Sequence, residues 1–202
     1  MPILNDNVKA DLDAGRPIRL NLGSGGTAKE GFYGVDHLAL AGVDVQADLN
    51  QPLDWLPDSS VDEIYSRHAF EHIDKILPLM RELHRVLKPG GTLRVIVPHF
   101  SNPYYYSDLT HCHPFGLYTF FYFCDREDQP RRKVPSFYVD FRYRVQSLRI
   151  RFYRHSLFDK LVAPIVSAFV NLSIGTQNWY ERRLCWIFHA WEIECVLRPI
   201  KH

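Results

Sequence analysis

The sequence predicts a doubly wound α/β fold, in which a mostly parallel sheet carries helices on its faces. Short apolar runs typical of strands alternate with helical connections through the first hundred residues, and this pattern is typical of parallel sheets. The run Ile18–Leu22 leads directly into the glycine loop "GSGG", Gly23–Gly26. Glycines gather where the backbone needs a positive φ or approaches a ligand closely. In such sheets, ligands bind at the carboxyl ends of the strands, where this loop would lie.

Length and composition indicate a single domain over residues 1–202. A chain of 202 residues that is 46% hydrophobic can bury one substantial core but is short for two independent domains. The formal net charge of +1 gives no electrostatic reason to expect a nucleic-acid partner. We therefore expect the binding partner to be a small molecule.

Cysteine usage and hydropathy favour a cytoplasmic protein. The N-terminal residues include acids and lack the cationic and apolar regions of a signal peptide. The longest apolar segment, 157–174, is interrupted by Asp159, Lys160 and Pro164, so we expect no transmembrane span. Four cysteines without metal-binding spacing suggest reduced thiols, namely Cys112, Cys124, Cys185 and Cys195.

Seven apolar segments are interpreted as strands, and the first connection between them is short. Only six residues separate Gly25 from Phe32, whereas a crossover helix with its loops needs a dozen or more. The first crossover is therefore expected to be a turn rather than a helix. In chain order the predicted strands cover 18–22, 32–35 closed by Asp36, 43–49, 63–66, 92–98, 145–153 and 191–200.

One amphipathic helix and two insertions complete the predicted organisation. Residues 76–87 place apolar side chains at intervals of three and four, and "KPGG" is expected to end this helix with a glycine beyond its last turn. Residues of about 101–140 are rich in aromatics, histidine and proline without a sustained period, which indicates a cover over a binding site. Apolar helical material at about 156–190 forms an insertion between the last two predicted strands.

Several motifs occur in a fixed order along the first half of the chain. Asp36 ends the second predicted strand, "ADLNQPL" follows the third, and "FEHI" precedes "MRELHRVLKPGGTLRVIVP". Over roughly residues 18–98 this set resembles the class I S-adenosylmethionine-dependent methyltransferases, especially their compact type 11-like branch, although Ser24 stands where that branch often has cysteine. The resemblance implies S-adenosylmethionine as cofactor. It also implies a seven-stranded Rossmann-like sheet with an antiparallel last strand.

The resemblance also implies which residues hold the cofactor. The glycines would let the main chain approach the methionyl portion and ribose, and the two oxygens of Asp36 suit the paired ribose hydroxyls. Asp48 and the amide of Leu49 would contact adenine. Residues just past the fourth strand would line the adenine or methionyl side. The implied set is Leu22, Gly23, Ser24, Gly25, Asp36, Asp48, Leu49, Arg67, His68 and Phe70.

Structural interpretations remain open for several of these side chains. Asp36 can cap a turn, and Asp48 can start one. Glu71 opens a helical segment, where a carboxylate interacts favourably with the helix dipole. His72 is interpreted as a structural residue.

The stretch "PHFSNPYYYSDLTHCHPF" supplies the catalytic candidates, His99, Asp108, His111 and His113. It follows the fifth predicted strand at the ligand-binding edge, and histidine titrates near neutrality, which suits proton removal from a substrate hydroxyl or amine. The same side chains are of metal-ligand types, and an H-x-H pair can bind zinc or iron. No fixed metal signature is present, so the sequence favours a base without a metal.

The expected reaction is methyl transfer to oxygen or nitrogen of a small molecule or glycan precursor, in a protein that can form a homodimer. Two other functions stay open. The first is an S-adenosylmethionine-binding regulatory or scaffold protein without turnover. The second is an NAD-dependent oxidoreductase, which Asp48, "FEHI" and the missing first helix disfavour.

Overall fold

The computed structural model describes residues 5–154 and 156–201, so residues 1–4, 155 and 202 of the predicted domain lie outside the described part. In chain order its elements are α1 (Asp6–Asp13), β1 (Arg19–Leu22), β2 (Tyr33–Asp36), β3 (Val45–Gln46), β4 (Val61–Arg67), η1 (Phe70–His72), α2 (Ile76–Val86), β5 (Leu87–Pro98), η2 (Pro103–Ser107), η3 (Thr119–Phe123), β6 (Arg142–Phe152), α3 (Leu157–Val170), α4 (Ile174–Arg183) and β7 (Ala190–Ile200).

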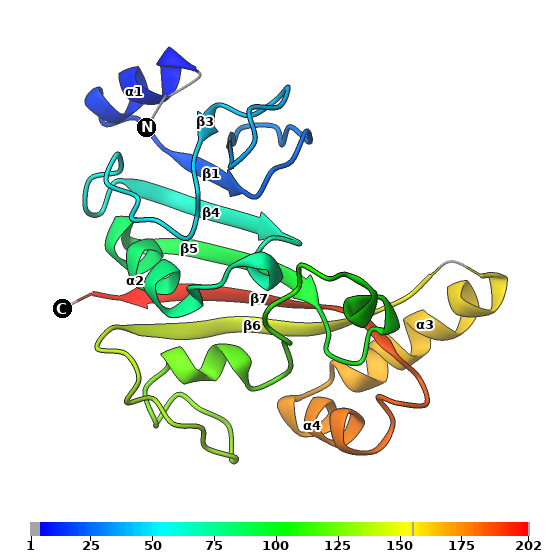
Figure 1. Ribbon diagram of the computed structural model, residues 1–202. Coiled ribbons are helices and arrows are strands. Elements are labelled where there is room, and N and C mark those ends of the chain that lie inside the picture. Colours follow the sequence, from blue (N-terminus) through cyan, green and yellow to red (C-terminus); the bar gives the residue numbers. More distant parts are fainter. Residues whose placement is uncertain (1–4, 155, 202) are drawn as a thin grey trace.

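One seven-stranded sheet organises the molecule, in the order β3-β2-β1-β4-β5-β7-β6 (Figure 1). Strands β1 to β5 pair in parallel, and β7 runs antiparallel to both β5 and β6. The carboxyl ends of the parallel strands therefore lie at one edge, on the same side as α3 and α4 (Figure 1). The predicted doubly wound sheet with an antiparallel last strand is confirmed.

The first crossover is a turn, as its length predicts. No helix occurs in residues 23–32 or 37–44, all of which the structure describes. Gly23 and Gly25 take φ angles of 65° and 54°, in the left-handed region that glycine adopts without steric cost. Strand β3 is shorter than predicted, because only Val45 and Gln46 pair with β2.

Helix α2 confirms the predicted amphipathic segment to within one residue, but the expected glycine after its last turn is wrong. Its buried residues include Leu79 and Leu83, which pack into the main core. The helix is capped by Leu87 in an extended conformation rather than by a glycine. Gly90 and Gly91 instead lie within β5, where the pairing with β4 is interrupted between Leu87 and Thr92. The glycines thus shape an irregular strand rather than a helix terminus.

The two faces of the sheet differ in chemistry. On one face, the main core contains three residues of β5, namely Leu93, Val95 and Val97. Because successive side chains of a strand point to opposite faces, Arg94 points to the other face. That second face carries a chain of ion pairs: Arg94 and Arg151 both contact Glu194, and Arg151 also reaches Glu192 at 3.7 Å. A charged face replaces part of the helical layer that usually covers a parallel sheet.

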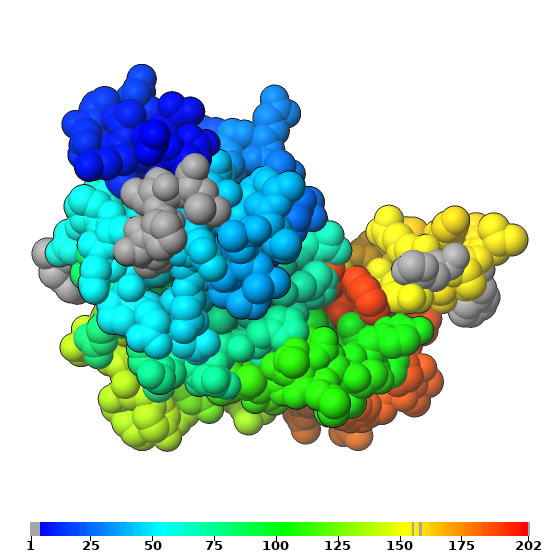
Figure 2. All heavy atoms as spheres, turned by 45° about the horizontal axis from the view of Figure 1, so that its top comes forward, coloured from blue at the N-terminus to red at the C-terminus, as the bar shows by residue number. Residues whose placement is uncertain are grey.

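The two predicted insertions have different structures. Residues 101–141 form short 3-10 turns and irregular backbone. Helix α3 begins with a capping box between Ser156 and Asp159, and the segment around it projects from the body (Figure 2). None of the helices in the described ranges is long and apolar enough to cross a membrane. A stripe of exposed apolar residues nevertheless follows α3, formed by Leu157, Leu161, Ile165, Phe169 and Leu172.

We expect Gly34→Ala to destabilise the sheet edge. A Cβ at Gly34 would lie 2.3 Å from the carbonyl oxygen of Gly42, a backbone atom that cannot move aside cheaply. Overpacking of this kind costs about 1 to 3 kcal/mol, measurable by urea unfolding. Gly26→Ala is the matched control, because its nearest neighbour would be 3.8 Å away. Equal stability of the two variants would contradict the packing described for β2.

Candidate functional site

Asp36 joins the glycine loop to the end of β2. Its buried carboxylate accepts hydrogen bonds from the amides of Gly25, at 2.8 Å, and Leu38, at 3.0 Å, and His37 Nδ1 lies 3.1 Å from it. A carboxylate offers about four lone-pair sites, so capacity remains for a ribose hydroxyl. The predicted neighbourhood of Asp36 and the glycine loop is therefore present.

The glycine loop lies against the segment after β4. A Cβ at Gly23 would be 2.2 Å from the Cβ of Ala69, so only glycine permits this contact. The Gly23 amide donates to the Val35 carbonyl at 2.8 Å, which keeps the loop next to β2. Leu22, which precedes the loop, and Ser24, which belongs to it, are both buried. Packing against Ala69 thus requires glycine at position 23, at the edge where the resemblance places the methionyl portion and ribose.

Asp48 and Leu49 follow β3 at the same edge of the sheet. The exposed side chain of Asp48 accepts from the amide of Asn50 at 2.9 Å, which is the turn-starting role considered from the sequence. Leu49 is buried in the main core. Their predicted contact with adenine stays a prediction.

Arg67 and His68 meet an acid from the far end of the chain. Glu192 in β7 is buried, and it lies 2.6 Å from Arg67 Nη2 and 2.7 Å from His68 Nε2. Burial alone would lower the pKa of His68, but hydrogen bonds to Glu192 and Glu71 outweigh it and raise this pKa to about 9. His68 is therefore cationic at neutral pH.

The backbone of His68 is also unusual, since its φ is 55°. A non-glycine residue in this region carries a conformational cost, and such residues cluster at functional sites. Phe70 follows two residues later as the first residue of η1, and it is fully buried. The segment after β4 is thus held in a constrained shape between the glycine loop and β7.

The four catalytic candidates lie at three different places. His99 has no exposed surface, and its ring nitrogens lie 2.8 Å from Ser101 Oγ and 3.1 Å from Glu181 Oε1. In this structure His99 therefore connects β5 to α4 and does not face a substrate. Asp108 and His111 lie together, with a carboxylate oxygen 3.7 Å from His111 Nε2.

His113 lies at the wall of an apolar cavity. Its Nε2 is 3.2 Å from the carbonyl oxygen of Asp74, so Nε2 carries the proton and Nδ1 keeps a lone pair. The cavity measures about 530 Å³. Its lining is mostly aromatic and aliphatic and includes Phe70, Met80, Phe115, Phe120, Tyr122 and Phe123.

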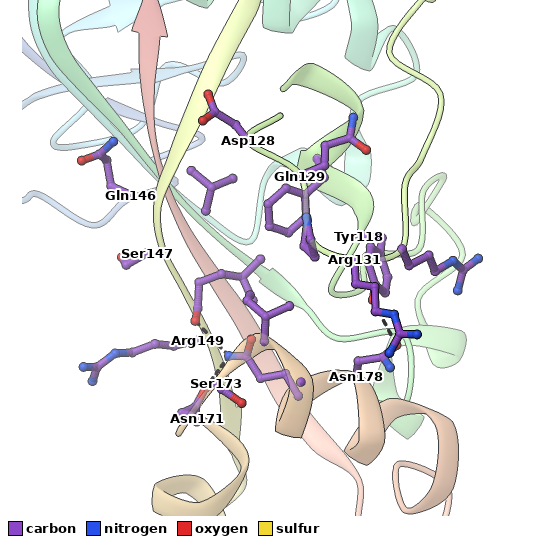
Figure 3. Close-up of a pocket in the computed structure, with 18 of the residues that line it drawn as sticks. Tyr118, Asp128, Gln129, Arg131, Gln146, Ser147, Arg149, Asn171, Ser173 and Asn178 are labelled. Atoms are coloured by element: carbon purple, nitrogen blue, oxygen red, sulfur yellow. Dashed lines mark hydrogen bonds between the residues drawn. The ribbon is translucent and has the colours of Figure 1, made fainter. Parts of the chain in front are cut away.

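A larger cavity of about 1190 Å³ lies elsewhere, between β6 and α4, and is lined by polar side chains (Figure 3). Tyr118, Arg131 and Asn178 line one side of it, and Arg149 the other. None of the residues implied in cofactor binding lines it. Phe70, which the resemblance assigns to cofactor binding, lines the smaller apolar cavity instead.

Comparisons with known proteins agree with this geometry. The family model described as "Methyltransferase domain" matches residues 31–95. No curated protein matches the sequence.

Several solved structures share the fold. A SAM-dependent methyltransferase from Archaeoglobus fulgidus superposes with a TM-score of 0.56 at 18% identity, covering 96% of this chain and 93% of that one. The YcgJ protein from Bacillus subtilis gives 0.52 at 13% identity, covering 96% and 98%. A chain from a complex of the Haloferax volcanii Trm112 methyltransferase activator with a methyltransferase gives 0.53 at 15%, covering 98% and 91%.

Residues 31–95 match a methyltransferase domain, and the strand order occurs in a fold shared with a solved SAM-dependent methyltransferase, which supports an S-adenosylmethionine-dependent methyltransferase. The chain is thus an enzyme whose cofactor, S-adenosylmethionine, supplies an electrophilic methyl group on a sulfonium when bound. The residues present fit this cofactor, because a Cβ at Gly25 would meet nothing within 4 Å and the amide of Gly25 lies beside the Asp36 carboxylate. The match to a methyltransferase domain favours this function over the two others considered from the sequence, a binding protein without turnover and an NAD-dependent oxidoreductase.

The sequence interpretation missed two buried acids. Glu192 and Glu194 alternate in "WEIECVL", and acids at every second position of a strand indicate a polar sheet face. The helix-dipole interpretation of Glu71 does not account for its environment, because its side chain is fully buried and its Oε1 lies 3.2 Å from His68 Nδ1. A carboxylate inside the core requires a cationic partner.

We expect Asp36→Ala to weaken cofactor binding. Loss of charge-assisted hydrogen bonds to the ribose would lower the binding free energy by about 1 to 3 kcal/mol, measured by calorimetric titration with S-adenosylhomocysteine. The exposed Asp54, replaced in the same way, is the matched control and should bind normally. Unchanged affinity in a folded Asp36→Ala protein would show that the ribose lies elsewhere.

Proposed function

We propose that the enzyme methylates a hydroxyl or amine on a small molecule whose aromatic or aliphatic body occupies the apolar cavity. This proposal is supported by one cavity that is lined both by Phe70, which the resemblance assigns to the cofactor, and by His113 of the cover. Pockets of this size with apolar walls and few polar groups are typical of small-molecule sites. A glycan precursor would find few hydrogen-bond partners on these walls.

His113 is the proposed general base. Its Nε2–H is held by the Asp74 carbonyl, which fixes the tautomer and leaves Nδ1 to accept a proton from the acceptor group. S-adenosylmethionine, held by the glycine loop and Asp36, would supply the methyl group to the acceptor atom and would keep the electron pair of the broken carbon–sulfur bond on its sulfur. The protein must hold the acceptor in line with that bond, and aromatic walls both orient it and exclude water. Asp108 and His111 lie beside this site and remain candidates for orienting the acceptor.

Turnover is tested with methyl-labelled cofactor and a panel of hydroxyaromatic compounds, amines and sugar nucleotides. We expect label transfer to a hydroxyaromatic or amine compound. His113→Ala should lower kcat by about 10²- to 10⁴-fold, as loss of a general base does, with unchanged affinity for S-adenosylhomocysteine. His189→Ala, an exposed histidine outside the cavity lining, is the control. Transfer only to sugar nucleotides would contradict the assignment of the apolar cavity.

We also propose that the enzyme is a cytoplasmic homodimer. The four cysteines are all free thiols, which fits a reducing compartment. The apolar stripe on α3, with side chains between 50% and 81% exposed, is a surface that a second copy would cover.

Light scattering after size exclusion tests the dimer. We expect the wild-type mass to be twice that of the chain and Leu161→Glu to shift it to the monomer, since a charge in an apolar interface is costly. Lys160→Glu, on the neighbouring exposed position, is the control. A monomeric wild-type protein would refute this assembly.

A further inference from the structure

Three potential metal ligands converge beside the proposed acceptor pocket. Glu71 and His72 belong to η1, and His111 lies in the cover. One carboxylate oxygen and one nitrogen from each ring all lie within 4.8 Å of one another. The sequence did not group these residues, since it favoured no metal and considered ligands only among His99, Asp108, His111 and His113.

The hydrogen bonds of His111 leave one nitrogen available as a ligand. Its Nδ1 is 2.8 Å from the carbonyl oxygen of Tyr105. A carbonyl only accepts, so Nδ1 must donate, and in the neutral ring Nε2 then carries the lone pair. Metal-binding histidines are typically oriented through their second nitrogen in this way.

His72 is oriented in the same manner. Its Nδ1 is 2.8 Å from Thr110 Oγ1, and that hydroxyl donates its own proton to Asp108 Oδ1 at 2.6 Å. The hydroxyl oxygen therefore accepts from His72 Nδ1–H, which leaves Nε2 with its lone pair. The two imidazole rings lie 4.7 Å apart, centroid to centroid.

Glu71 supplies an independent sign that a cation belongs here. Its side chain has no exposed surface, and Oε1 lies 3.2 Å from His68 Nδ1. The other oxygen, Oε2, is buried and has no hydrogen-bond partner among the described residues. An unsatisfied buried carboxylate oxygen is costly, and a bound cation would remove that cost.

The cluster is also held together without an ion. The amide of Cys112 donates to the carbonyl oxygen of Glu71 at 2.7 Å, which ties the cover to η1. The ring of Tyr105 stacks on His111 with 4.8 Å between centroids. Ligands from two segments are therefore positioned before binding.

We propose that Glu71, His72 and His111 bind a first-row divalent metal ion such as Zn²⁺. Two imidazoles and one carboxylate are a common ligand set for zinc and for other metals of this row, and they leave coordination positions open. Phe70 and His113, neighbours of these ligands in the chain, line the acceptor cavity. An acceptor oxygen could therefore occupy an open position and lose its proton more easily; this use of the metal rests on the proposed function.

Metal binding is tested directly on protein stripped with a chelator, without cofactor or substrate. Calorimetric titration with Zn²⁺ should show one site per chain, and Co²⁺ should give visible absorption bands of nitrogen and oxygen ligation. Glu71→Gln, His72→Ala and His111→Ala should each lower Zn²⁺ affinity at least tenfold. His189→Ala is the matched control and should leave it unchanged.

Two readouts keep the test decisive if a variant folds poorly. Zn²⁺ should raise the Tm of the wild-type protein, because a ligand of the native state stabilises it. Absence of a saturable site in the wild type, or full affinity in folded variants, would overturn the proposal. A thiolate-to-cobalt charge-transfer band would also overturn it, by making the exposed Cys112 a ligand. Methyl transfer by stripped protein would refute only the catalytic use of the metal.

Discussion

The carboxylate of Asp36 provides the contact on which the cofactor site depends. It binds the amides of Gly25 and Leu38, and so holds the loop after β1 against the end of β2. A helix usually does this in dinucleotide-binding proteins, where its N-terminus binds a pyrophosphate. Residues 23–32, all described, contain no helix. This arrangement suits a nucleoside without a pyrophosphate, which agrees with the methyltransferase domain that residues 31–95 match.

Charged residues occupy one face of the sheet at the strands β4, β5, β7 and β6. Glu192 and Glu194 are buried beneath arginines from three other strands, Arg67, Arg94 and Arg151. This network extends to His68, so the charged face and the segment after β4 that the resemblance assigns to the cofactor are physically connected.

Much of the fold could be predicted, because strand patterns and motif order are local properties of the chain. The glycine loop, Asp36 and the short crossover follow from residues 18–36 alone. The missed features depend on contacts between distant residues. His99 looked like a catalytic base at the ligand edge, but its burial depends on Glu181 in α4. Likewise, Glu71 and His72 become a candidate metal site only when the cover brings His111 beside them.

We propose that an adenosyl group lies at the carboxyl edge of β1, β2 and β3, with its ribose at Asp36. A crystal structure of the protein with S-adenosylhomocysteine tests this most directly. We expect a ribose hydroxyl within hydrogen-bond distance of Asp36 and the amino acid portion over Gly23–Gly25. A nucleoside found instead in the polar cavity beside Arg149, between β6 and α4, would contradict the account.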